Sequence, residues 1–334
     1  MTKPRLSIFI ALIPLIAGIM FCALPAQAVT LVPPSLEFSD VQPGVTIPSK
    51  IKLFNETAGP LTLYSQTANF SALDETGTPK VNLEKTQGDL ASWISIESGP
   101  FTLAPGERIE IPFTIVLPAD APPGGHYASL LFSPQPPESI QQGQLAIDQK
   151  IGMLILVSVR GTMNEAGSIL DLTADGGKTL FTRLPVIFSL RFKNSGNIHL
   201  RPTGNLTIRN MLGGTTVVIP INTDTGATLP QSVRRYDAVW ENANNAGARG
   251  NFFQEVGREW KNFAFGPYTA SVSLVFGQTN EKTVATTLRL WLFPWHLLLI
   301  WLIGIAVVVF IIIVFVRRYN HWIITRSNQP PKQK

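Results

Sequence analysis

An alternation of apolar and polar side chains runs through most of this chain and limits its fold more than any other feature. In RIEIPFTIVLP, residues 108–118, Ile109, Ile111 and Phe113 alternate with charged or small neighbours. A period of two is that of a β-strand with one buried face. Turn sequences such as QPGVTIP and DETGTP separate these runs. Closely spaced strands without helical periodicity predict an all-β fold of antiparallel sandwiches.

The alternating runs form two similar sets. In each set one strand ends in an asparagine turn, at Asn55 and at Asn194. In each set a late Gly/Pro turn leads into a strand that begins with tyrosine. We therefore predict two tandem immunoglobulin-like antiparallel sandwiches, the first over 29–160 and the second over 161–290.

A run of apolar residues near the C-terminus predicts a transmembrane helix. LLLIWLIGIAVVVFIIIVFV, residues 297–316, contains no charged residue. At about 1.5 Å per residue, about twenty residues cross a hydrocarbon core about 30 Å thick. Aromatic side chains typical of membrane boundaries flank the run: Trp291, Trp295, His296, Tyr319 and Trp322. We expect a membrane helix with its aromatic boundary over 291–316, followed by a basic cytoplasmic tail over 317–334.

The first 28 residues have the features of an export signal. Two basic residues precede an apolar run, and Ala26-Gln27-Ala28 fits the small-x-small cleavage pattern. An uncleaved anchor is the alternative. Cleavage at this point would remove Cys22, the single cysteine, and leave a mature chain without disulfides or thiolate ligands. Both termini therefore predict a single-pass protein of the cell membrane whose body is extracytoplasmic.

The net charge of +5 arises from the two ends of the chain. Seven basic residues lie in acid-free terminal segments, and without them 20 basic residues stand against 22 acidic ones. A basic body that would bind nucleic acid is absent from the sequence.

The segment PPGGHYAS, around His126, is the strongest candidate for catalysis. We interpret Pro122-Pro123-Gly124-Gly125 as a turn and the residues after it as the next strand. The four histidines do not form a metal-ligand pattern, and the sequence has no nucleophile elbow or phosphate-binding loop. We expect no enzyme activity, no catalytic residues, no metal, no cofactor and no small-molecule substrate.

One segment, 241–266, departs from the strand pattern. Phe252, Phe253, Val256 and Trp260 recur at spacings near three and four, which predicts a short amphipathic helix weakened by Gly257. We favour the interpretation that these aromatic residues cap the second sandwich, because helices that cover a sheet normally turn their apolar face to the core. The alternative is a partner-binding face formed by Phe252, Phe253 and Trp260.

The layout and several motifs resemble the WxL-interacting cell-surface proteins of bacteria. The matching stretches cover most of 29–295 and include VPPSLEFSDVQPGVTIPSKIKLFNET, LAPGERIEIPFTIVLPADAPPGGHYASLLF, FSLRFKNSGNIHLRPTGNLTIRN, LPQSVRRYDAVW and FGPYTASVSLVFG. The resemblance implies a first domain that contacts peptidoglycan or a cell-wall protein, and a second domain that meets another surface partner.

These expectations define a leading function and two alternatives. The leading hypothesis is a membrane-anchored adhesion protein that binds cell-wall components or other surface proteins through sheet edges or loops. The second is a membrane-tethered envelope assembly factor resembling pilus chaperones. The third, an exported enzyme, lacks a recognisable nucleophile and base.

Overall fold

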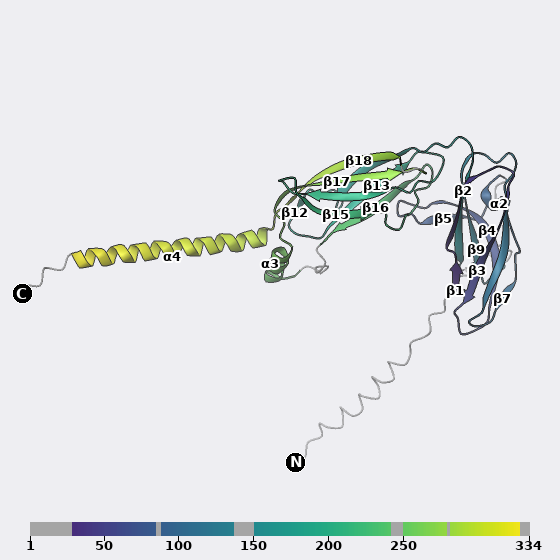
Figure 1. Ribbon diagram of the computed structural model, residues 1–334. Helices are drawn as coiled ribbons and strands as arrows, with labels where there is room; N and C mark the ends of the chain where they lie inside the picture. The colour runs from purple at the N-terminus through teal and green to yellow at the C-terminus, as the bar shows by residue number, and fades with distance from the viewer. Residues whose placement is uncertain (1–28, 85–87, 137–149, 242–249, 279–280, 328–334) are drawn as a thin grey trace, which may run out of the picture. The chain divides into compact units, whose positions relative to one another are not determined.

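The computed structural model describes residues 29–84, 88–136, 150–241, 250–278 and 281–327, and it divides into two compact units (Figure 1). The first unit ends at Asn164, and the second takes in Asp74–Thr78 and Glu165–Lys334. Each described unit is an immunoglobulin-like β-sandwich, and the second continues into helical segments, so the predicted fold class is confirmed. The predicted signal segment, 1–28, lies outside the described residues.

Two facing sheets form the first sandwich. One sheet has the strand order β1-β3-β8-β6, and the other has the order β2-β10-β9-β4-β5, with β7 also paired to β4. The elements are β1 (Val29–Val32), β2 (Ser35–Val41), β3 (Thr46–Asn55), β4 (Leu61–Ala72), β5 (Pro79–Asn82), α2 (Leu90–Trp93), β6 (Ile94–Ile96), β7 (Phe101–Leu103), β8 (Arg108–Val116), β9 (Gly124–Ser133) and β10 (Ile151–Val159).

The core of the first sandwich follows from the alternation in its strands. On β8, Ile111, Phe113 and Ile115 are buried while their neighbours are exposed or half-buried. They meet Phe132 of β9 and Ile155 of β10 from the other sheet, both fully buried. Burial of these side chains, each contributing about 1.5–3 kcal/mol, holds the two sheets together without a disulfide.

The second sandwich repeats this arrangement. One sheet has the order β11-β13-β16 and the other the order β12-β18-β17-β14-β15. A hairpin joins β14 and β15 through Asn210–Gly214, where Gly213 has a φ of 81°. The strands are β11 (Gly167–Ala174), β12 (Leu180–Phe181), β13 (Val186–Asn194), β14 (Thr203–Arg209), β15 (Thr215–Ile221), β16 (Val233–Trp240), β17 (Gly266–Phe276) and β18 (Lys282–Leu292).

Each antiparallel sandwich contains one parallel strand pair. In the first, β1 pairs antiparallel with β3, whereas β2, just beyond it, pairs parallel with β10. In the second, β11 pairs antiparallel with β13, whereas β12 pairs parallel with β18. The opening segment of each sandwich therefore passes from one sheet to the other and joins the closing strand, which alternation of side chains alone does not reveal.

Asn55 and Asn194 hold equivalent turns in the two sandwiches. They end β3 and β13, and both are completely buried. Each side-chain amide donates to the carbonyl four residues on, at 2.9 and 2.8 Å. Each also donates across the sandwich, Asn55 to the carbonyl of Leu103 at 3.1 Å and Asn194 to that of Thr228 at 2.9 Å. At each predicted asparagine turn, a buried side-chain amide therefore connects two parts of the sandwich that are distant in sequence.

Two helices belong to the second unit, one between β16 and β17 and one after β18. α3 (Phe252–Lys261) confirms the predicted short helix, and the side chains of Asn251 and Gln254 form a capping box at its start. α4 (Trp295–Ser327) is the helix among the described residues that is long and apolar enough to cross a membrane. It begins at Trp295, whereas Trp291, from the expected aromatic boundary, belongs to β18, which continues to Leu292. It also runs through Arg317 and Arg318, because their side chains favour helix.

Candidate functional site

The sequence around His126 is part of the sandwich. Gly124 and Gly125 are the first residues of β9, so their assignment to the preceding turn is wrong. The reason is that β9 pairs with β10 along its full length, to Gly124 opposite Val159. Nε2 of His126 lies 2.9 Å from the carbonyl oxygen of Pro122, and its ring packs on Trp93 at a centroid distance of 4.7 Å.

These contacts give His126 a structural part in the sandwich. Within the described residues, no group of three or more His, Cys, Asp or Glu side chains is placed to hold a metal ion.

The three aromatic residues proposed for partner binding lie on α3, in two different environments. Phe252 packs against Trp295 and His296 of α4, at ring centroid distances of 6.3 and 5.5 Å. Phe253 and Trp260 are 78% and 64% exposed. The capping interpretation is therefore wrong for Phe253 and Trp260, whose side chains point away from the sandwich core.

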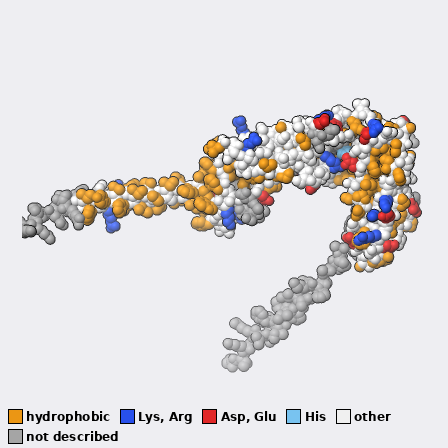
Figure 2. Space-filling model, in the orientation of Figure 1, with side chains coloured by type: hydrophobic (Ala, Val, Ile, Leu, Met, Phe, Trp, Pro, Cys, Tyr) orange, Lys and Arg blue, Asp and Glu red, His pale blue; other side chains and the backbone are white. Residues whose placement is uncertain are grey.

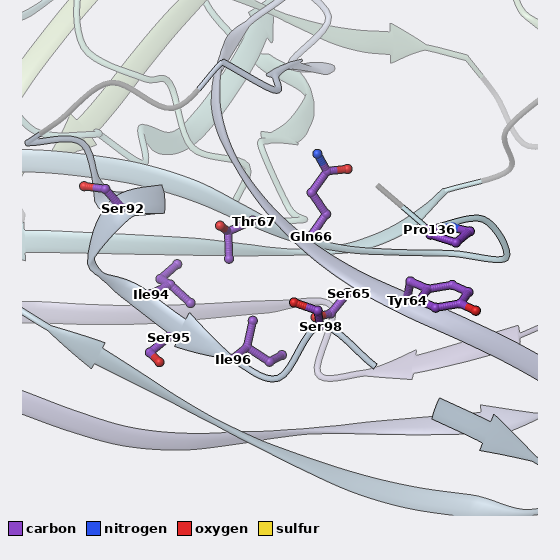
Figure 3. Close-up of a pocket in the computed structure, with 10 residues that line it drawn as sticks. All are labelled: Tyr64, Ser65, Gln66, Thr67, Ser92, Ile94, Ser95, Ile96, Ser98 and Pro136. Carbon is purple, nitrogen blue, oxygen red and sulfur yellow. The ribbon is translucent and has the colours of Figure 1, made fainter. Parts of the chain in front are cut away.

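The first sandwich contains a polar groove that the sequence analysis did not predict. It lies between β4 and the segment that crosses from α2 through β6 to Ser98, and has a volume of about 680 Å³ (Figure 3). Its lining residues are Tyr64, Ser65, Gln66, Thr67, Ser92, Ile94, Ser95, Ile96, Ser98 and Pro136.

Hydrogen bonds from β4 to this crossing segment join the two walls of the groove. The backbone N–H of Ser65 donates to the carbonyl of Ser98 at 3.0 Å, and its hydroxyl donates to that of Glu97 at 2.5 Å. The hydroxyl of Thr67 donates to the carbonyl of Ala91 at 3.1 Å. The two walls are therefore tied together at the buried residues, and the hollow lies outside these bonds.

The groove offers neutral hydrogen-bonding groups. The side chains of Gln66, Ser95 and Ser98 hydrogen-bond to no other residue in the described part of the chain, and none of the lining side chains is acidic or basic. Such a surface suits a neutral ligand rich in amides or hydroxyls, because an ionic group would find no counter-charge there.

Strand pairing leaves a gap along β4 beside the groove. β7 pairs with Leu61–Leu63 and β5 with Asn69–Ala72 on one side of β4. Between them, Tyr64–Thr67 pair with β9 on the other side, and on the gap side the backbone N–H of Ser65 bonds to Ser98 instead of to a strand. On the opposite wall, β6 pairs with β8, and no described strand pairs with its other edge. The serines of SWISIES, spaced three apart, are the sequence signal that could have identified this wall.

No protein-family model and no curated protein matches the chain. It is similar to several solved structures. The class 5 fimbriae chaperone CfaA has 11% identity and a TM-score of 0.38, over 78% of this chain and 98% of that one. The CupB2 chaperone of Pseudomonas aeruginosa has 10% identity and a TM-score of 0.34, over 78% and 100%. The PapD-like domain 7 of human CEP192 has 14% identity and a TM-score of 0.28, over 42% and 89%. Similarity this low supports no conclusion about function.

Proposed function

We propose that this protein is a membrane-anchored, extracytoplasmic binding protein whose first sandwich holds an extended segment of a surface protein. The observation that carries the proposal is the gap in strand pairing along β4, which opens into a neutral polar groove. Extended peptides bind sandwich domains by adding to such unpaired strand backbone, while side-chain pockets select the sequence.

A polypeptide fits the groove better than a wall glycan. Sugar hydroxyls would use the serine and glutamine side chains alone. An extended peptide would use those and also the backbone of Thr67 and the outer edge of β6, which no described strand occupies. A peptidoglycan partner is therefore the competing outcome of the experiment below.

α4 supports the anchor. Its apolar stretch from Trp295 to Ile323 is almost entirely exposed on the protein, unlike a core helix of a sandwich. With the basic residues that follow, the proposed orientation leaves both sandwiches outside the cell and the end of the chain in the cytoplasm. Membership of the WxL-interacting family and a non-enzymatic role are part of this proposal.

The test uses full-length protein in detergent micelles and a matched pair of variants. Ser95→Phe fills the groove from β6, whereas Ser35→Phe places the same side chain at an exposed position on β2. Wild type and Ser35→Phe should retain a surface protein from an envelope extract, and Ser95→Phe should lose it. Equal capture by both variants would overturn the site.

Two further arms separate the alternatives. Retention on purified peptidoglycan that Ser95→Phe abolishes would make the wall glycan the ligand. An assembly role predicts instead that a bound client is released folded, and that this client is degraded in cells that carry Ser95→Phe.

A further inference from the structure

The pattern of burial on α3 is the reverse of that expected for a helix of a water-soluble domain. Its two acidic residues, Glu255 and Glu259, are buried, whereas Phe253 and Trp260 are mostly exposed. Gly257 lies between these two aromatic residues on the same exposed face. In water a surface helix shows the opposite arrangement, with polar residues outward and apolar residues inward.

The buried acids attach α3 to the two structures beside it. Glu255 pairs with Arg183, from the connection before β13, and accepts the backbone N–H of Gly250 at 2.8 Å. Glu259 pairs with the start of α4, where its Oε1 lies 2.6 Å from Nδ1 of His296. His296, expected as a boundary residue of the membrane helix, is thus half-buried in this junction. α3 is therefore held at a fixed position beside the first turn of α4 (Figure 1).

Exposed aromatic side chains surround this junction. Hydrophobic side chains gather where α4 begins (Figure 2). Besides the residues of α3, the exposed aromatic residues are Phe263, Phe265, Trp291, Phe293 and Trp295, each between 44% and 62% exposed. Exposure of this much aromatic surface to water is unfavourable by roughly 25 cal/mol per Å². Apolar patches of this kind mark contact with a partner or a membrane.

An apolar groove lies between α3 and α4. It has a volume of about 510 Å³ and is lined by Trp260, Ile300, Trp301, Gly304, Ile305, Val308 and Val309. Ile300 lies about 8 Å along the helix axis from Trp295, at a rise of about 1.5 Å per residue. Interfacial helices bury their apolar face about 5–10 Å into the boundary between headgroups and acyl chains, which is the depth of the near end of the groove. Val309, at its far end, lies about 21 Å from Trp295 along the axis.

We infer that α3 lies in the surface of the membrane that α4 crosses, with Phe253 and Trp260 among the lipids and an acyl chain in the groove beside Trp260. The inference rests on the membrane anchor of the proposed function. A lipid is the occupant because the exposed aromatic face continues directly into the lipid-facing surface of α4. The exposed Lys261, at the end of α3, can extend to the headgroups.

The same contacts position the second sandwich. α3 forms ion pairs with both the sandwich and α4. If α3 lies in the membrane surface, these contacts therefore determine the angle between the second sandwich and the bilayer. A protein attached by a flexible linker would have no such preferred orientation.

The experiment places a fluorescent label at α3 in full-length protein in lipid nanodiscs. Gly257→Cys suits this purpose because space around Gly257 is open and both aromatic residues are kept. Cys22→Ser removes the other thiol. The labelled control Thr283→Cys lies at the end of β18 farther from α4, about 30 Å along the strand from Leu292. A third label, at Phe310→Cys, lies on α4 outside the residues that line the groove and reports insertion of that helix.

Lipids with a nitroxide near the headgroup should quench most of the fluorescence at 257, and aqueous iodide should quench little of it. The label at 283 should give the reverse. A label at 257 that iodide quenches as fully as the one at 283 would overturn the inference, provided that the label at 310 is quenched by lipid. Failure of the label at 310 would instead contradict the membrane anchor itself.

A pair of double variants tests the aromatic side chains directly. Phe253→Gln with Trp260→Gln should expose the label at 257 to iodide and leave the label at 310 unchanged. Thr283→Gln with Thr287→Gln, on the exposed side of β18, should change neither. Lipid quenching at 257 that survives the loss of both aromatic residues would contradict their proposed role.

Discussion

The carboxylate of Glu259 on α3 accepts a hydrogen bond from the backbone N–H of Leu297, at 2.8 Å. Leu297 lies in the first turn of α4, where backbone N–H groups have no partner within the helix. The negative charge of Glu259 also complements the positive end of the helix dipole. An acid from one helix therefore caps another, and the junction between the second sandwich and its apolar helix depends on it.

Glu259→Ala should weaken this junction. The substitution leaves the buried N–H of Leu297 without its acceptor, at a cost of about 1–3 kcal/mol. Hydrogen exchange in micelles should show faster exchange of the first amides of α4. Glu259→Gln, which keeps an acceptor, should have a smaller effect. Exposed Glu281→Ala is the control, and equal protection in all variants would contradict the capping role.

Glu255 should make the attachment of α3 depend on pH. Burial by itself would raise the pKa of this carboxyl, but the N–H of Gly250 and the guanidinium of Arg183 hold the pKa below its ordinary value of 4.5. A lowered pKa in the folded protein means that the stabilisation is complete above about pH 4.5 and is lost as the pH falls through the folded value.

Acid titration followed by hydrogen exchange of α3 checks this expectation. In Arg183→Met the loss of protection should begin at higher pH, because the carboxyl has lost its cationic partner. Glu255→Gln should remove most of the pH dependence. Arg209→Met, at an exposed position on β14, should behave as wild type. An unchanged midpoint in Arg183→Met would contradict the assignment.

Asn55→Ala and Asn194→Ala should each destabilise its own sandwich. Each removes a buried amide and leaves carbonyl groups such as those of Leu103 or Thr228 without their donor, at a cost of about 1–3 kcal/mol. Hydrogen exchange during denaturant unfolding should show the loss in β9 for Asn55 and in β17 for Asn194. Asn82→Ala, at an exposed position on β5, should change little.

Two glycine substitutions should have opposite effects on the second unit. A Cβ at Gly204 would lie 2.0 Å from the carbonyl oxygen of Ser273, so Gly204→Ala must push β14 from β17 and lower stability by at least about 2 kcal/mol. Gly257→Ala meets open space within α3 and should stabilise that helix by about 0.5–1 kcal/mol. Thermal unfolding and hydrogen exchange of α3 measure the two effects, and a stabilising Gly204→Ala would contradict the close packing.

The candidate site could be predicted only in part. The sequence analysis identified Phe252, Phe253 and Trp260 from their helical spacing, but it could not give the direction of their face. That direction depends on Arg183 and His296, which lie far from α3 in sequence and pair with its acids. The groove beside β4 depends on where β5 and β7 begin and end, and such boundaries are set by tertiary pairing.

By itself the sequence determined the strands, the two similar sets, the asparagine turns and the apolar helix, because these follow from side-chain periodicity and local turn chemistry. Tertiary structure decided how the opening segment of each sandwich divides between two sheets, where β4 is left unpaired, and which way α3 faces. Each of those outcomes depends on hydrogen bonds and ion pairs between residues distant in the chain, as between Glu259 and Leu297. A local sequence pattern does not reveal such contacts.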